Sequence, residues 1–133
     1  MARALPGVKA TKGCEPGDRV SFRAKVLRAW ESGGLRMVLV GDASGLTRVE
    51  TGEATLEVGA SYDFREAEVK QYPGGWTSVS VADGEAVRLD EEIEAPQDEA
   101  YIERTFKILS GIQRKKARKE GRAPPWEHPA KSE

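Results

Sequence analysis

Nine side chains within residues 17–90 could bind an anionic chain that carries flat rings. The aromatic ones are Trp30, Tyr72 and Trp76, which offer flat faces for stacking on bases. The basic ones, which can pair with phosphates, are Arg23, Lys25, Arg28, Arg36, Arg48 and Lys70. Cations along a backbone and aromatic faces against its bases are what binding of a single nucleic-acid strand without sequence preference requires.

Several of these residues also have a purely structural interpretation. Trp30 shares the strand parity of the apolar residues before it and could close the end of a barrel, and Tyr72 could also belong to the core. Arg23 and Lys25 could form the solvated face of a strand, and Arg48 could pair with the glutamate two residues later. Trp76 follows Pro-Gly-Gly and is harder to bury, which favours a functional role.

Catalytic and metal-binding chemistry has little support in the composition. The single cysteine, Cys14, excludes a disulfide framework, and the single histidine, His128, argues against a histidine-based cluster. No nucleophile–base pair and no phosphate-cradling glycine loop is visible, so we expect neither an enzyme nor a cofactor. No apolar run approaches the length of a membrane span, and the first residues do not form a signal peptide.

The net charge of −1 hides two opposed blocks. Residues 83–103 contain nine acids and one base, and residues 104–122 contain eight bases and one acid. The acidic run Asp90–Glu94 is interpreted as a solvated linker rather than a metal site, and it could also compete with nucleic acid for basic groups. The basic block is interpreted as a phosphate-binding or solubilising tail, and it contains Arg114, Lys115, Lys116, Arg118 and Lys119.

Alternating apolar and polar residues predict five strands, over residues 18–31, 35–41, 46–51, 61–71 and 77–82. The apolar parity changes within the fourth strand, which indicates a bulge near Glu66. Residues 84–89 extend or resume the fifth strand. Five short strands favour a small closed barrel of the OB type, although SH3-like barrels and small sandwiches fit the spacing nearly as well.

Around this all-β unit, residues 17–90, we expect less regular segments. Residues 1–16 are predicted to be a flexible arm, residues 91–97 an acidic linker and residues 120–133 a flexible tail. Residues 98–119 are predicted to form an amphipathic helix with a basic end, whose apolar face contains Ile102, Phe106, Leu109 and Ile112. That helix should pack on its own barrel, where it could cover an end that lacks the usual capping helix, or on another subunit.

Residues 36–50, which read RMVLVGDASGLTRVE, resemble the second and third strands of replication protein A-type OB domains, and residues 56–76 resemble their fourth strand and the loop before the fifth. The similarity is strongest to the archaeal single-stranded-DNA-binding members. The resemblance implies a five-stranded OB-fold barrel that binds a strand across its second and third strands, between two flanking loops. Arg48 matches the basic residue of the third strand, and Tyr72 and Trp76 match the aromatic loop. The large aromatic expected at the end of the third strand is replaced by Glu50 and its neighbours.

The resulting expectation is a cytoplasmic protein of archaeal type that binds single-stranded DNA without catalysis, in replication, repair or recombination. RNA is an alternative ligand, because recognition of a 2′-hydroxyl leaves no visible mark in the sequence. A protein–protein module of a multi-subunit complex is the other alternative, with a second OB-fold subunit bound through the C-terminal helix. The missing aromatic favours this last interpretation.

Overall fold

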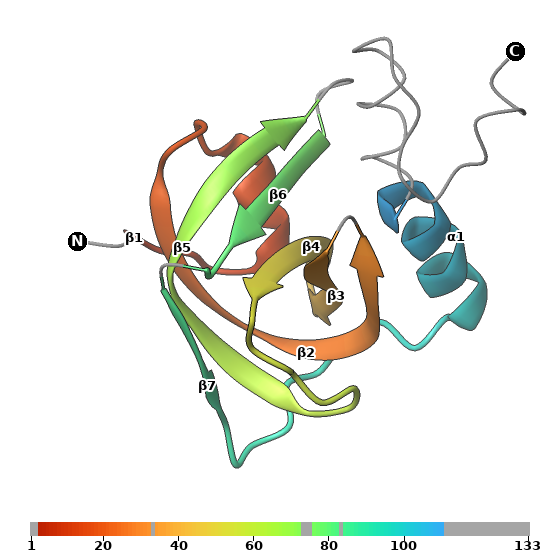
Figure 1. Cartoon of the computed structure of the whole chain (residues 1–133). Helices are drawn as coiled ribbons and strands as arrows, with labels where there is room; N and C mark the ends of the chain where they lie inside the picture. Colours follow the sequence, from red (N-terminus) through yellow and green to blue (C-terminus); the bar gives the residue numbers. More distant parts are fainter. Residues whose placement is uncertain (1–2, 33, 73–75, 83, 111–133) are drawn as a thin grey trace, which may run out of the picture.

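The computed structural model describes residues 3–32, 34–72, 76–82 and 84–110. Its strands form one sheet in the order β1-β2-β3-β4-β6-β5-β7, and an additional pairing of β2 with β5 closes five of them into a ring (Figure 1). The elements are β1 (Arg3–Ala4), the 3-10 helix η1 (Val8–Gly13), β2 (Arg19–Ser32), β3 (Leu35–Asp42), β4 (Gly45–Gly52), β5 (Ser61–Tyr72), β6 (Trp76–Ser80), β7 (Glu85–Arg88) and α1 (Glu99–Ser110).

The ring closes because β2 is long enough to serve two neighbours. Its first half pairs antiparallel with β5, and its second half, from residue 25 onward, pairs antiparallel with β3 across an irregularity at residues 26–28. A parallel pairing of β4 with β6 completes the circuit. This five-stranded barrel with one C-terminal helix is the OB fold, so the predicted fold class is confirmed.

The barrel interior is filled by the apolar parity of each strand. Along β2 the buried residues alternate with polar ones, from Val20 through Phe22 and Ala24 to Val26. Phe22 stacks on Phe64 of β5 with ring centroids 5.2 Å apart. The interior therefore follows the two-residue period of the sequence.

The predicted bulge in β5 is present at Glu66, whose φ of 54° is the only positive value among the described residues other than glycine. Phe64 and Ala67 are both fully buried, so the inward parity changes across this residue. The chain returns against the bulge at Gly84, where an added Cβ would lie 2.3 Å from the carbonyl oxygen of Arg65. Strand β7 then pairs with β5 instead of extending β6.

The N-terminal segment differs from the flexible arm that its composition predicts. Strand β1 pairs in parallel with β2, and Val8 of η1 is fully buried in the barrel core. The backbone N–H of Val8 donates to Asp42 Oδ2 at 3.1 Å, and that of Lys9 donates to Ser44 Oγ at 3.1 Å. The pairing of β1, the apolar contacts of Leu5 and Val8 and two hydrogen bonds to the β3–β4 hairpin thus attach this segment, whose other residues are mostly polar or glycine.

Helix α1 packs on the outer face of its own barrel, not over a barrel end. Ile102 and Leu109 form a second apolar cluster with Leu39 of β3 and Leu46 of β4, separate from the barrel interior. Asp98 caps the helix, because its Oδ1 accepts the N–H groups of residues 100 and 101 at 3.0 and 3.3 Å. The part of the predicted helix beyond residue 110, with Ile112 and the basic block, lies outside the described residues. Within them, no helix is long and apolar enough to cross a membrane.

Candidate nucleic-acid interface

The candidate interface is the outer face of β4, β6 and β5, between two turns. One turn joins β2 to β3, and the other joins β5 to β6 (Figure 1). Tyr72 and Trp76 are cross-strand partners at the ends of β5 and β6, and only their backbone positions are described. Residues 73–75 between them lie outside the described residues. The sequence therefore places both predicted aromatics at one of the two turns.

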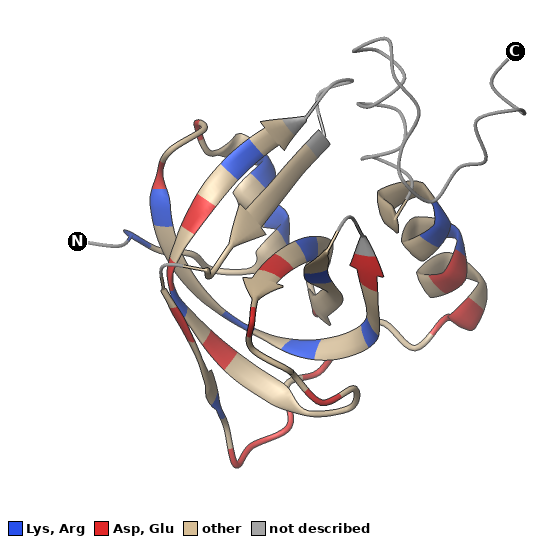
Figure 2. Ribbon diagram, in the orientation of Figure 1, with Lys and Arg blue, Asp and Glu red and all other residues tan. Residues whose placement is uncertain are grey.

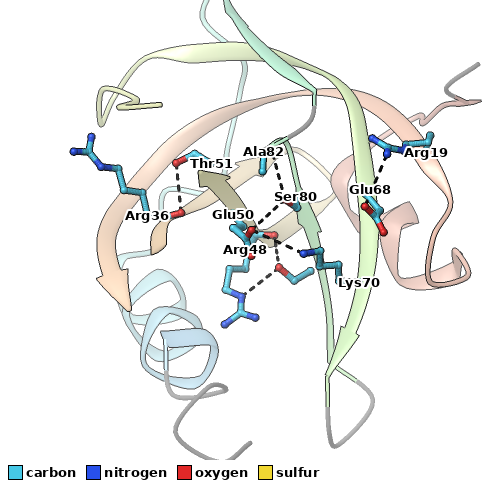
Figure 3. Close-up of polar contacts among 10 residues, drawn as sticks. Arg19, Arg36, Arg48, Glu50, Thr51, Glu68, Lys70, Ser80 and Ala82 are labelled. Atoms are coloured by element: carbon cyan, nitrogen blue, oxygen red, sulfur yellow. Dashed lines mark hydrogen bonds and ion pairs between the residues drawn. The ribbon is translucent and has the colours of Figure 1, made fainter. Parts of the chain in front are cut away.

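A polar cluster occupies the centre of this face (Figure 3). Glu50 of β4 accepts a hydrogen bond from Ser80 Oγ at 3.3 Å, and its Oε2 lies 3.9 Å from the Lys70 Nζ of β5. The side chain of Glu50 is 10% exposed, and that of Lys70 is 40% exposed. Lys70 is thus an accessible cation with a carboxylate beside it, at the place where the resemblance would put an aromatic ring.

Arg48 is buried beneath helix α1. Its residue is 1% exposed, Nε donates to Ser78 Oγ at 3.3 Å, and Nη1 donates to the carbonyl oxygen of Leu109 at 3.0 Å. The last carbonyls of a helix have no partner within the helix and carry partial negative charge, so a guanidinium is well suited to them. While α1 is docked, this arginine holds the end of the helix and does not face solvent.

Two predicted cations of β2 pair with the segment that follows β7. Arg23 Nη1 lies 2.9 Å from Glu91 Oε1, and Lys25 Nζ lies 2.5 Å from Glu92 Oε1. The hydrogen bond from Lys25, and then its positive charge, lower the pKa of Glu92 below its ordinary value. The acidic linker is therefore solvent-exposed on one side and in contact with basic groups on the other.

The last part of β2 meets helix α1. Arg28 Nη2 lies 2.7 Å from Glu99 Oε2, and Arg28 Nε lies 3.8 Å from Glu103 Oε1. Trp30 packs edge-to-face on Phe106, with centroids 5.2 Å apart and an interplanar angle of 76°. Trp30 therefore contributes to helix docking, a third role beside the barrel end and the base platform that the sequence suggests.

Arg36 lies at the start of β3, beside a pocket of about 240 Å³. Its Nε is 3.6 Å from Glu31 Oε2, and the pocket is also lined by Trp30, Met37 and Leu56. All six predicted barrel cations consequently contact an oxygen of this chain. Five meet carboxylates and Arg48 meets a helix carbonyl.

The sequence pattern does not by itself assign partners to these cations. The acidic run, as a linker that could compete for basic groups, is the signal that points to Glu91 and Glu92. Nothing local points to Ser78 or Ser80, whose hydroxyls organise the polar cluster. Among the described residues, no group of His, Cys, Asp and Glu could hold a metal ion. The predicted basic tail lies beyond residue 110, outside the described part.

Comparison with known proteins identifies the fold of the chain and assigns it to no family. No protein-family model matches the chain, and no curated protein matches it. The OB domain of a Methanosarcina mazei protein is 27% identical, with a TM-score of 0.56, over 64% of this chain and 84% of that one. Schizosaccharomyces pombe Pot1pC bound to single-stranded DNA is 13% identical, with a TM-score of 0.53, over 83% of this chain and 99% of that one.

A murine DNA-binding protein bound to double-stranded DNA is also similar, at 18% identity and a TM-score of 0.51. The likeness covers 70% of this chain and 50% of that protein. The likeness to these structures, one of which is named as an OB domain, shows that the chain has an OB fold.

Proposed function

We propose that this chain binds single-stranded DNA, without catalysis, on the outer face of β4, β5 and β6. The observation that carries the proposal is the position of Tyr72 and Trp76, which are paired backbone positions at the ends of the two strands β5 and β6. They share strand parity with Lys70 and Ser78, respectively, whose polar groups lie in the cluster on that face. Stacking residues beside an accessible cation match the chemistry of a base and its phosphate.

Two likenesses support the same ligand. Residues 36–50 and 56–76 resemble replication protein A-type domains, and Pot1pC, a structural neighbour of nearly the same extent, is bound to single-stranded DNA. We extend this to a role in replication, repair or recombination in a prokaryotic cytoplasm. The basic tail, with Arg114, Lys115, Lys116, Arg118 and Lys119, would add phosphate contacts that do not depend on sequence.

The direct test is fluorescence anisotropy of labelled dT and rU oligomers titrated with the full chain at two salt concentrations. We expect binding of dT that weakens steeply with salt. Trp76→Ala should weaken it by about tenfold or more, since stacking contributes about 1–3 kcal/mol per base. Lys70→Gln should also weaken it, whereas Lys12→Gln, the same change at an exposed position on η1, should not.

The outcomes separate the possible ligands. Equal or tighter binding of rU would make RNA the ligand. Absence of binding to both oligomers at low salt would overturn the proposal, and undiminished binding by Trp76→Ala would remove its central residue.

A protein–protein module is the second candidate, because specific observations favour it. Helix α1 covers part of the β3 and β4 face, and Glu50 stands where a stacking aromatic is expected. In that case the barrel would assemble with another OB-fold subunit, and the helix carries an exposed apolar residue, Ile108, on its outer side. Sedimentation of the chain without any oligomer would reveal an assembly of this kind in which the second subunit is another copy of the chain.

A further inference from the structure

Three cations form a row along the outer face of β2, and one acidic segment lies along it. We call residues 90–99 the acidic strap; it connects β7 to the start of α1, and Figure 2 shows it in red segments between these two elements. The three ion pairs are Arg23–Glu91 at 2.9 Å, Lys25–Glu92 at 2.5 Å and Arg28–Glu99 at 2.7 Å.

The carboxylates of the strap contact the cations that the phosphates of a nucleic-acid strand would contact. Acids and cations follow one another in the same order, and Arg23 and Lys25 are about 6.6 Å apart along the strand, at about 3.3 Å per residue. Each contact is a short charge-assisted hydrogen bond to an anionic oxygen. Three carboxylates therefore already contact the cation row in sequence order.

The strap is attached at both ends but only weakly in between. Near its start, the N–H of Leu89 donates to the Ser61 carbonyl at 2.9 Å, and that of Ile93 donates to Ser61 Oγ at 2.9 Å. At its other end, α1 is held by the apolar cluster that contains Ile102. This attachment gives the carboxylates a high effective concentration at the row.

The pairs themselves are of the exposed kind, which contribute little each. The glutamate side chains are 58%, 72% and 76% exposed, whereas those of Lys25 and Arg28 are only 25% and 30% exposed. Water and salt compete with such contacts, so the acids can turn away from the row without exposing any apolar surface. Lys25 and Arg28, being partly buried, keep their positions.

We propose that the β2 row is a phosphate-binding site and that the acidic strap occupies it until a nucleic-acid strand displaces it. This inference rests on the proposed function and adds a second contact surface and its regulation. The strap lowers the affinity of the resting chain, and it selects ligands with several consecutive phosphates over single anions, because only those replace all three carboxylates at once.

The test compares two variants of equal net charge in the full chain. The strap variant is Glu91→Gln/Glu92→Gln/Glu99→Gln, and the control variant is Glu15→Gln/Glu57→Gln/Glu85→Gln, three exposed glutamates away from the row. We expect the strap variant to bind a dT oligomer about tenfold more tightly than the natural chain, and the control within about twofold. Adding Arg23→Gln/Lys25→Gln/Arg28→Gln to the strap variant should cancel the gain.

Salt dependence provides an independent readout. In the natural chain a phosphate replaces a carboxylate, so few counterions are released at the row. In the strap variant Arg23 and Lys25 no longer face a carboxylate, whereas Arg28 keeps Glu103 beside it, so the slope of log K against log[salt] should steepen by about 2. The control variant should keep the slope of the natural chain.

The outcomes distinguish this inference from the proposed function. Equal gains in dT affinity in the strap and control variants would indicate a net-charge effect and would overturn the proposal. The proposal would also be overturned if the natural chain binds dT and the strap variant binds it no more tightly. If neither binds at low salt, with the row unobstructed, both proposals fail. Because Glu99 also favours the N-terminal end of α1, Glu91→Gln/Glu92→Gln alone must still bind at least about threefold more tightly.

Discussion

The docking of helix α1 on its own barrel can be tested by one substitution made at two positions of the same helix. Ile102 is 3% exposed in the cluster with Leu39 and Leu46, whereas Ile108 is 40% exposed on the other side. We expect Ile102→Ala to destabilise the chain strongly and Ile108→Ala to have little effect. The change in helix propensity is the same at both positions and cancels in the comparison.

The magnitude follows from the three carbon atoms that the substitution removes. At about 0.8 kcal/mol per buried methylene the transfer loss is about 2.4 kcal/mol, and an unfilled cavity brings the total at Ile102 to about 2–4 kcal/mol. For a chain of this size, about 4 °C of Tm per kcal/mol gives a decrease of about 8–16 °C. The loss at Ile108 should stay below about 1 kcal/mol.

The assay is urea unfolding followed by Trp fluorescence, together with hydrogen exchange of the α1 amides. In Ile102→Ala these amides should exchange at least about 30-fold faster than in the natural chain, even if the barrel itself stays folded. Losses at the two positions that agree within about 0.5 kcal/mol, with unchanged exchange, would show that this face of α1 does not dock on β3 and β4.

Other perturbations follow from single features of the fold. Val8→Ala should cost about 1–3 kcal/mol in urea unfolding, because the side chain is fully buried; a free N-terminal arm would show no loss. Gly84→Ala should lower Tm markedly, since its Cβ would lie within 2.3–2.6 Å of two backbone oxygens of the β5 bulge, and an unchanged Tm would contradict this close approach. Glu66→Gly should stabilise by up to about 1 kcal/mol by removing the cost of a positive φ, and any destabilisation would argue against that φ. In an NMR titration of side-chain carboxyls, the pKa of Glu92 should lie below its ordinary value and return to it in Lys25→Gln. Since a lowered pKa in the folded state favours folding only while the acid is ionised, the Lys25–Glu92 contact should be lost as the pH falls through that pKa.

The barrel is predictable from the sequence because each strand is recognised from a pattern of neighbouring residues. Inward and outward residues alternate along each strand, and a break in that alternation is enough to locate the bulge at Glu66. The attachment of the N-terminal segment escapes prediction for the same reason. Leu5 and Val8 are its main apolar anchors, and they lie among glycines, prolines and charges that show no period.

The chemistry of the candidate site is predictable only by residue type. Arg23 and Glu91 are 68 positions apart, and Arg48 meets the Leu109 carbonyl across 61 positions, so no short window along the chain contains both partners. Which cation faces solvent depends on where α1 docks, and that depends on an apolar contact with β3 and β4. The clustering of acids is visible in the sequence, but the strand that receives them is not.

The β3–β4 hairpin has a practical consequence for how this domain should be divided. The N-terminal segment binds its turn through Asp42 and Ser44, and the C-terminal helix covers Leu39 and Leu46 on its strands. A fragment trimmed to the barrel alone, residues 17–90, would lose both covers and leave these leucines in water. We therefore expect such a fragment to be poorly soluble and to aggregate, and residues 3–110 to be the smallest piece that behaves as a monodisperse protein.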